Sequence, residues 1–571
     1  MLSISHVASR LQRPFLRVVV TNQSYIFRHY SQPSSSEQPG EKVPTRPNTS
    51  PAQNHPRHEV HERSEAINIP FNPPGGGGPG AAGSGGSFQF TGSPFFDATL
   101  TTLVGLGVVF IGGIAYLRWY KKNVLDKIEL AFEPGYDPAL EVAEHYHTRA
   151  DTSSEKHMKR REQDQIDRII HGEEVGHYYV LLGPKGAGKG TMIFDSMAAI
   201  QADGVAMCDA HPDLEVFRLR LGKALNYEYN EDSQTGLFQR RDPREGGAAL
   251  DIERALNKLE KVALRVSRRR HKPLILIVNN VHYFNNDEAG RNMLLQLQQR
   301  AEAWAASGIM TMVFSTDDFW PFFVMRKVAS RMHVFSISDL DTREALHACI
   351  RMRANVKKQI EHHDHDQIKE AVSIVGGRLS YLNKVATSVD ALEMSNSLLE
   401  IEKAWLLSQI GLIQDCDDDV MDEQKWSSCS WLLLQEFVKM RQEQEEERRL
   451  QSEKYGKDES PEFPMPSIPY HKCRQIMTRA DFLEELDRVN IVSIDVNHNV
   501  RPDSMLILLA ARQVVETEGF EEVLNSVRDR IDEIESLHRT RELTFKDVDK
   551  GDRIRLVVDK GGAELLESRQ S

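Results

Sequence analysis

Residues 178–191 read YYVLLGPKGAGKGT, an apolar stretch that passes directly into a glycine-rich loop. A loop of this kind between a strand and a helix lets backbone N–H groups surround a phosphate, which faces the positive end of the helix. Gly183, Gly186 and Gly188 permit the tight loop, and we expect Lys189 to reach the β- and γ-phosphates of a nucleotide. The stretch therefore predicts a phosphate-binding loop (P-loop) for ATP or ADP. The expected nucleotide-binding residues are Gly183, Pro184, Lys185, Gly186, Ala187, Gly188, Lys189, Gly190 and Thr191.

The loop departs from the usual pattern immediately after its lysine. The Ser or Thr that ordinarily binds Mg²⁺ at this point is replaced by Gly190, and Thr191 follows it. Thr191 is the candidate Mg²⁺ ligand, but it points about 100° further round the helix than the usual hydroxyl. Metal binding at this end of the site is therefore expected to be altered.

The chain around the loop alternates between apolar runs and segments long enough for a helical crossover. This pattern predicts a parallel sheet covered by helices on both faces, which is a three-layer α/β domain. The expected strands are Tyr178–Leu182, Val205–Cys208, Leu274–Val278, Met310–Phe314 and Val334–Ile337.

The third expected strand ends in polar residues where a P-loop protein usually places two acids. Residues 274–284 read LILIVNNVHYF. The usual acids bind Mg²⁺ and activate water, whereas Asn279 and Asn280 carry no charge and cannot act as bases at neutral pH. We interpret Asn279 as a weak metal ligand and expect nucleotide binding with slow or absent hydrolysis. Thr316, or Ser315 beside it, is the predicted sensor of the γ-phosphate at the end of the fourth strand.

Four motifs together resemble a known family. GPKGAGKGT (183–191), LILIVNNVH (274–282), ISDLDTREA (337–345) and GGRLSYL (376–382) resemble the origin-recognition-complex-like branch of AAA+ proteins and the signal-transduction ATPases with numerous domains. The resemblance covers roughly residues 174–400. It implies a helical lid after the core, a second sensor arginine at Arg378 and a winged helix further on. The order of features also resembles fungal mitochondrial proteins with an AAA core and a C-terminal winged helix.

The N-terminal region indicates where the protein is located. Residues 1–30 contain arginines but no acidic residue, as in a mitochondrial transit peptide, and we expect cleavage after Tyr30. A linker rich in Pro, Ser and Gly follows, and then the uncharged run 98–117 is long enough to cross a membrane. Three basic residues after this run favour placement of the core in the mitochondrial matrix, whereas arrest of the imported chain at this helix would leave the core in the intermembrane space. They are Arg118, Lys121 and Lys122.

Composition limits the other functions of the chain. A net charge of −13 argues against a protein that coats nucleic acid, and the five cysteines form no CxxC pair that would suggest a zinc site. The basic cluster at residues 265–272 lies at the expected end of a helix, where cations are favourable for structural reasons alone. Residues 491–503, IVSIDVNHNVRPD, predict the wing of a winged helix.

The sequence thus predicts an inner-membrane AAA+ protein that binds ATP or ADP with Mg²⁺ and acts as a switch or chaperone-like factor. A protein partner would bind the lid and winged helix, and the chain could form homo-oligomers. The alternatives are a mitochondrial DNA or RNA maintenance factor, which is not favoured, and a nucleoside monophosphate kinase. The expected parts are a transit peptide (1–30), a linker (31–97), a transmembrane helix (98–117), a helical connector (118–172), an AAA+ core (173–340), a lid (341–412), a winged helix (420–550) and a tail (551–571).

Overall fold

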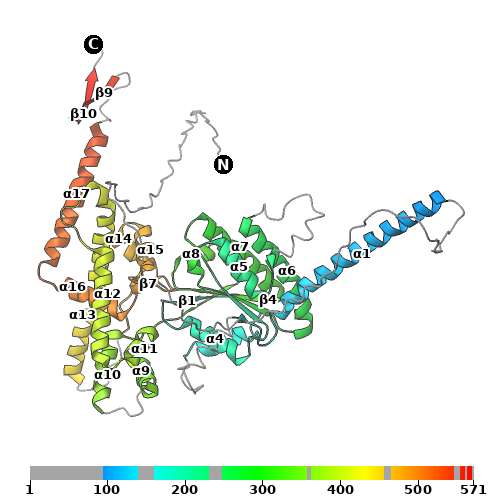
Figure 1. Cartoon of the computed structure of the whole chain (residues 1–571). Helices are drawn as coiled ribbons and strands as arrows, with labels where there is room; N and C mark the ends of the chain where they lie inside the picture. The colour runs from blue at the N-terminus through cyan, green and yellow to red at the C-terminus, as the bar shows by residue number, and fades with distance from the viewer. Residues whose placement is uncertain are drawn as a thin grey trace, which may run out of the picture. The chain divides into compact units, whose positions relative to one another are not determined.

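The computed structural model describes most of the chain beyond the expected linker (Figure 1). The described residues are 94–138, 160–229, 247–356, 362–455, 464–544, 553–559 and 562–568. The predicted transit peptide and almost all of the predicted linker lie outside them.

A five-stranded parallel sheet forms the centre of the core and confirms the predicted α/β architecture. Its strand order is β2-β3-β4-β1-β5, and all four neighbouring pairs run parallel. Because parallel strands end at the same edge, this order places the end of β4 between the ends of β1 and β3. The strands are β1 (Tyr178–Leu182), β2 (Val205–Asp209), β3 (Leu274–Asn279), β4 (Met310–Thr316) and β5 (Met332–Ser336).

Helices cover both faces of this sheet (Figure 1). Tyr179, Leu181 and Ile277 belong to the apolar cluster under α3 and α4, whereas Val180 and Leu276 belong to the cluster under α5, α6 and α7. This alternation explains why the strands read as continuous apolar runs, since both faces are buried. The helices are α3 (Gln163–Ile170), α4 (Lys189–Ala199), α5 (Leu214–Ala224), α6 (Gly247–Arg270), α7 (Glu288–Ser307) and α8 (Trp320–Arg326).

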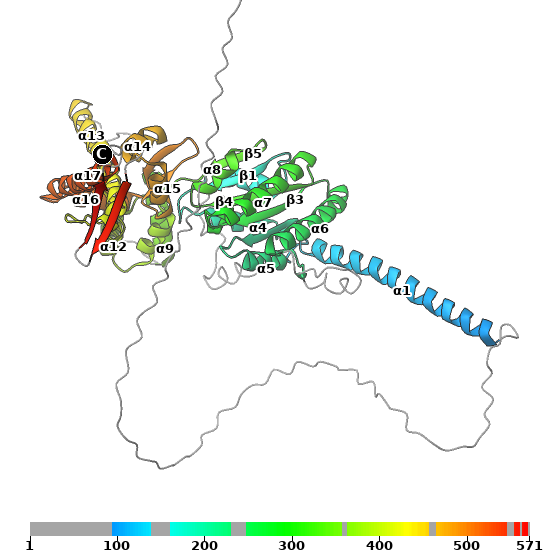
Figure 2. The same ribbon diagram turned by 90° about the horizontal axis from the view of Figure 1, so that it is seen from above.

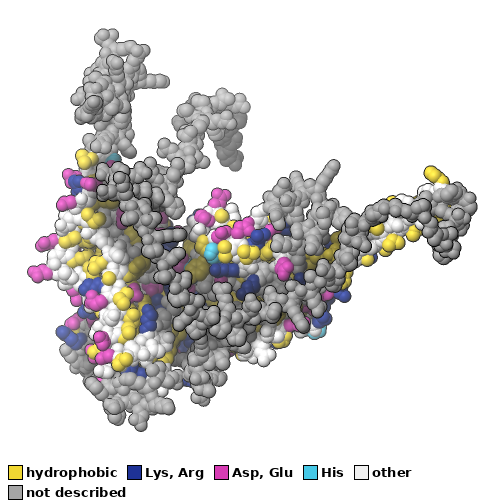
Figure 3. Space-filling view, in the orientation of Figure 1, with side chains coloured by type: hydrophobic (Ala, Val, Ile, Leu, Met, Phe, Trp, Pro, Cys, Tyr) yellow, Lys and Arg dark blue, Asp and Glu magenta, His cyan; other side chains and the backbone are white. Residues whose placement is uncertain are grey.

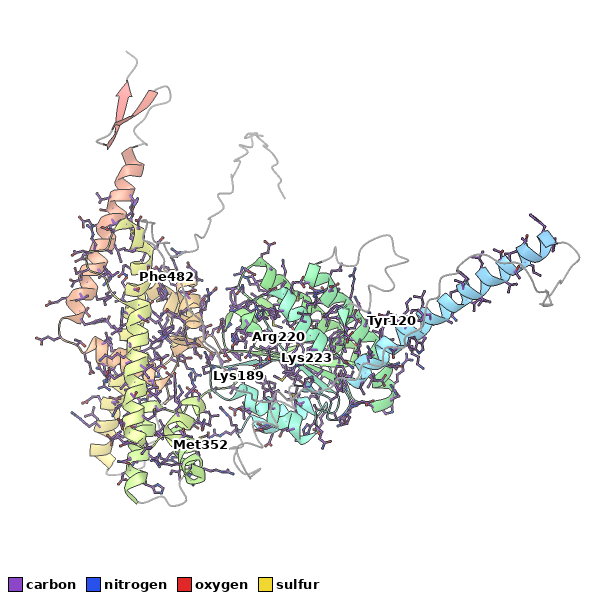
Figure 4. All side chains as sticks on the ribbon, in the orientation of Figure 1. Tyr120, Lys189, Arg220, Lys223, Met352 and Phe482 are labelled. Carbon is purple, nitrogen blue, oxygen red and sulfur yellow. The ribbon has the colours of Figure 1, made fainter. Side chains whose placement is uncertain are left out.

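Helix α1 (Pro94–Leu130) contains the predicted membrane span and continues beyond it into the core. By length and composition alone, Thr99–Leu130 could cross a membrane. The apolar side chains of its first part are exposed and visible in Figure 3, whereas Val124 and Ile128 are buried in the core. Tyr120 marks the junction in Figure 4 and is partly buried there. The helix therefore continues past residue 117 into the expected helical connector, and its last turns pack on the core itself.

The basic cluster at residues 265–272 holds this helix in place. Arg265 pairs with Asp126 at 2.7 Å and also contacts Glu129, which Arg269 contacts as well. Arg270 pairs with Asp203 at 2.6 Å. These ion pairs give the cluster the structural role that its position predicts.

Four helices follow the core where the lid is expected. The lid helix that matters most for the site is α11, because it begins immediately after Arg378. The four helices are α9 (Thr342–Val356), α10 (His362–Val375), α11 (Leu379–Thr387) and α12 (Ala391–Ile410).

The C-terminal region contains the predicted wing. Strands β7 and β8 form an antiparallel hairpin, and β6 pairs with β8 to complete a three-stranded sheet (Figure 2). One long helix, α13, precedes this sheet in the chain, and the expected tail includes the antiparallel pair β9 and β10. The elements are α13 (Met421–Tyr455), β6 (Ile468–Pro469), α14 (Tyr470–Met477), α15 (Ala480–Arg488), β7 (Val492–Ile494), β8 (Asn499–Pro502), α16 (Met505–Val515), α17 (Phe520–Thr544), β9 (Arg553–Asp559) and β10 (Gly562–Ser568).

Candidate nucleotide-binding site

The glycine-rich loop lies between β1 and α4, as its sequence predicts. Gly186 and Gly188 have φ angles of +81° and +98°, which side-chain-bearing residues rarely adopt. A Cβ at Gly186 would also meet Ser380 Oγ, and one at Gly188 would meet Leu379 of the lid. Gly188 is the N-cap of α4 and has no side chain to cap the helix. The first N–H groups of α4 are thus left for an anion.

Lys189 is buried at the start of α4, with only 5% of its surface exposed (Figure 4). Its Nζ donates to Gly183 O at 2.6 Å and to Pro184 O at 3.0 Å, and it lies 2.6 Å from Asp317 Oδ1. Burial lowers the pKa of Lys189, and the charge of Asp317 opposes this shift. The three acceptors use all three protons of the ammonium group.

His282 fixes the position of Asp317. The backbone N–H of Asp317 donates to His282 Nδ1 at 3.1 Å, so the ring proton must lie on Nε2. That Nε2 is 3.7 Å from Asp317 Oδ2. Burial lowers the pKa of His282, which keeps the ring neutral. His282 thus holds the backbone of Asp317, and Lys189 pairs with its carboxylate.

The predicted γ-phosphate sensors lie on opposite faces of β4. Val313 packs in the cluster beside α4 and Phe314 in the cluster on the other face, so alternation places Ser315 on the face that α4 covers. Thr316 therefore lies on the opposite face, and its Oγ1 donates to Asp318 O at 2.8 Å. Ser315 Oγ is buried with no hydrogen-bond partner among the described residues. Of this group, Asp317 is the residue that contacts Lys189.

Asparagines stand at the last residue of β3 and the residue after it, where a P-loop protein usually has the metal-binding acid and the catalytic base. Asn279 is buried at the end of β3, and its Nδ2 donates to Asp209 Oδ1 at 2.9 Å across the β2–β3 pair. Asn280 has φ 55° and ψ 46°, a left-handed conformation that asparagine tolerates better than most residues. The carboxylate beside Asn279 thus comes from β2, at a position that the sequence did not single out.

The start of α4 has room for the hydroxyl that it lacks. A Cβ at Gly190 would meet nothing within 4 Å, and Thr191 is exposed on the same helix. Asn279 and Asp209 offer side-chain oxygens at the ends of β3 and β2, and Thr191 lies one residue beyond the usual hydroxyl position. Oxygen ligands suit Mg²⁺, but only one of these three residues carries a charge.

Arg378 joins the P-loop to both the core and the winged helix. Its Nε donates to Asp339 Oδ1 at 2.7 Å, and its Nη1 donates to Lys185 O and Asp503 Oδ2, both at 2.9 Å. Its Nη2 also donates to the backbone carbonyl of Asp503. Arg378 is only 2% exposed. Burial raises the pKa of Asp503, while Arg378 acts to lower it.

Arg160 supports the loop from the other side. Its Nη1 donates to Ala187 O at 2.6 Å and its Nη2 donates to Ser338 O at 2.5 Å. The sequence did not identify this residue, because nothing in the basic run around it separates Arg160 from its neighbours. Two further arginines contact neighbours in the same chain: Arg326 lies 2.7 Å from His498 of the wing, and Arg331 donates to Gly176 O at 3.4 Å.

The sheet order, the P-loop, the lid and the wing together define an AAA+-type P-loop protein with a C-terminal winged helix. Residues 407–535 match the family model described as fungal AAA protein, C-terminal winged helix domain. No match was found among the curated proteins.

Several solved structures are similar to the chain. A Walker-type ATPase of Pyrococcus abyssi is 13% identical, with 63% of this chain and 98% of that chain covered and a TM-score of 0.40. Cdc6p from Pyrobaculum aerophilum is 12% identical, with 67% and 98% covered and a TM-score of 0.30. Domain III of the Thermotoga maritima replication initiation protein DnaA is 13% identical, with 43% and 95% covered and a TM-score of 0.26. At these scores the fold assignment rests on the sheet order and the P-loop themselves.

Proposed function

We propose that this protein is a membrane-anchored mitochondrial nucleotide switch that binds ATP or ADP at residues 183–191. The observation that carries the proposal is the buried junction at Arg378, which contacts the P-loop, the core and the winged helix at once. A nucleotide at the loop would lie against this junction. A bound nucleotide would change the free energy of the contacts that Arg378 makes with the loop and with Asp503. A protein partner that binds the lid and winged helix could respond to that change.

Slow hydrolysis is part of the proposal. Loss of a positioned general base typically lowers a rate by about 10²–10⁴-fold. Neither Asn279 nor Asn280 can serve as a base, and Gly190 cannot bind the metal. When Mg²⁺ is bound, it would neutralise phosphate charge, with Thr191, Asn279 and Asp209 as the candidate residues around it. Because only one of these three residues carries a charge, they support a protein that responds to nucleotide binding and not to nucleotide hydrolysis.

Anchoring through α1 is the second part of the proposal. The exposed apolar side chains of α1 and the acid-free N-terminal sequence support a single span in the mitochondrial inner membrane. Arg118, Lys121 and Lys122 are exposed at the end of the span and favour a core in the matrix. Protease treatment of mitoplasts tests this orientation. Digestion of the C-terminal domain without lysis of the inner membrane would place it in the intermembrane space.

A combined binding and turnover measurement tests the switch itself. Full-length protein in detergent is titrated with ADP and ATP, and single-turnover hydrolysis is followed with Mg²⁺ present. We expect saturable binding with turnover near the background rate. Rapid hydrolysis that depends on Lys189 would contradict the proposal, since another acid would then supply the base.

The basic cluster at residues 265–272 is ion-paired to α1 and Asp203, so the proposal does not include nucleic acid as a partner.

A further inference from the structure

The cations of the site are already paired with carboxylates of the protein. Lys189 lies 2.6 Å from Asp317, and Arg378 lies 2.7 Å from Asp339 and 2.9 Å from Asp503. Two cations thus face three carboxylates. Lys189 and Arg378 are both nearly fully buried, so water screens these charges little.

The position of Asp317 corresponds to the place of a third phosphate. It follows β4, the strand between β1, which carries the P-loop, and β3, which carries Asn279. The lysine of a P-loop reaches the β- and γ-phosphates, so a group that contacts Lys189 from the β4 end competes with the γ-phosphate. The Asp317 side chain is 16% exposed, and its carboxylate cannot turn away without loss of the ion pair with buried Lys189.

The diphosphate part of a nucleotide is held differently. Backbone N–H groups of the loop and the N-terminus of α4 would bind the α- and β-phosphates. The partial positive charge of these groups does not depend on the ion pairs of Lys189 and Arg378. Side-chain cations bind a γ-phosphate, and here both are neutralised. Asp317 would also repel the added negative charge directly.

From this asymmetry we propose that the site prefers a nucleoside diphosphate to a triphosphate, and that Asp317 is the residue that determines this specificity. The inference rests on the proposed nucleotide switch and identifies ADP as the ligand of its resting state. ADP fills the loop beside the Lys189–Asp317 pair, whereas ATP must displace Asp317 from Lys189 before its third phosphate can bind.

Equilibrium binding of ADP and of the non-hydrolysable ATP analogue AMP-PNP to the full-length protein in detergent tests the inference. The titrations are done in EDTA, so that no Mg²⁺ neutralises the phosphates. We expect wild-type protein to bind ADP at least about tenfold more tightly, which corresponds to about 1.4 kcal/mol. Asp317→Asn should remove that preference by tightening AMP-PNP binding about tenfold, with ADP affinity changed by less than about threefold.

The matched control is Asp341→Asn. Asp341 is an exposed carboxylate that pairs with Arg161 at 3.2 Å, away from Lys189, and its removal should leave the wild-type preference intact. Thermal unfolding checks that each variant is folded. If Asp317→Asn is not, Asp317→Ser offers a smaller neutral side chain, and the wild-type preference is measurable without any variant.

The outcomes separate the inference from the function on which it rests. Equal wild-type affinities for both nucleotides would overturn the inference and leave the switch standing. Weaker AMP-PNP binding by Asp317→Asn would also overturn it, because Asp317 would then support the third phosphate. Failure of wild-type protein to bind either nucleotide would instead defeat the proposed function.

Discussion

The two sides of the candidate site contrast sharply. The phosphate side, residues 183–189 with Arg378, retains every feature of a binding loop: glycines with positive φ, a buried lysine and a lid arginine. The metal side, Gly190 with Asn279 and Asn280, lacks the hydroxyl and both acids that its positions usually carry. Binding depends largely on backbone geometry, whereas catalysis depends on particular side chains. One function can therefore be lost from such a site while the other remains.

Breaking the phosphate side at Arg378 should have the largest effect. Arg378→Ala leaves Asp339 and Asp503 partly buried without their cation, which typically costs about 3–5 kcal/mol of stability. We expect a clear fall in the melting temperature, measured by calorimetry. Adding Asp503→Asn should restore part of the loss. Arg161→Ala, at a largely exposed arginine, is the control and should change stability by less than about 0.5 kcal/mol. An unchanged melting temperature in Arg378→Ala would show that the contacts of Arg378 do not contribute to stability.

Substitution of Lys189 should have the second-largest effect. Lys189→Ala leaves the Asp317 carboxylate beside the phosphates without its cation, and truncation of one partner of a buried charge pair typically costs about 2–5 kcal/mol of binding energy. We expect ADP affinity to fall at least about 30-fold in calorimetric titration. The double variant Lys189→Ala, Asp317→Asn restores the charge balance and tests whether repulsion by Asp317 adds to the loss. Lys223→Ala, an exposed lysine on α5, should bind normally. Unchanged affinity in Lys189→Ala would place the nucleotide elsewhere.

Repair of the metal side should have a smaller, opposite effect. Asn279→Asp alone would put two carboxylates where Asn279 Nδ2 and Asp209 Oδ1 now lie 2.9 Å apart, and should be destabilising. Exchange of the pair, Asn279→Asp with Asp209→Asn, keeps one acid and one amide but moves the charge to β3. We expect Mg²⁺-dependent ATP hydrolysis to rise about tenfold, because Mg²⁺ gains an anionic ligand there. A doubly substituted protein that is folded but no more active would show that the missing acid is not what limits turnover.

The smallest predicted effect is a pH dependence at Asp318. Burial, and then the charge of Asp317, raise the pKa of Asp318 from 3.8 to about 7. Since the folded pKa exceeds the unfolded one, protonation favours folding, and this contribution is lost as the pH rises through 7. Wild-type protein should lose about 1 kcal/mol more than Asp318→Asn between pH 6 and 8, as measured by denaturant unfolding. The same pH slope in both proteins would exclude Asp318 as its source.

The sequence predicted the sheet and the loop well because both are local patterns. Each core strand is an apolar run buried on both faces, and the P-loop is contiguous. The residues it missed have distant partners: Asp209 contacts a residue 70 positions away, and Asp503 contacts Arg378 over 125 positions. No local pattern distinguishes such acids from surface ones.

The continuity of α1 has an electrostatic consequence. From Arg118, at the end of the proposed span, to Val124, the first of its residues buried in the core, there are six residues. At 1.5 Å per residue this is about 9 Å, close to the Debye length of about 8 Å at physiological ionic strength. In the proposed anchored protein, the face of the core around α1 would therefore lie about one Debye length from the lipid headgroups, where their field is only partly screened. The charge of the surrounding membrane would act directly on the acids and arginines that join α1 to α6.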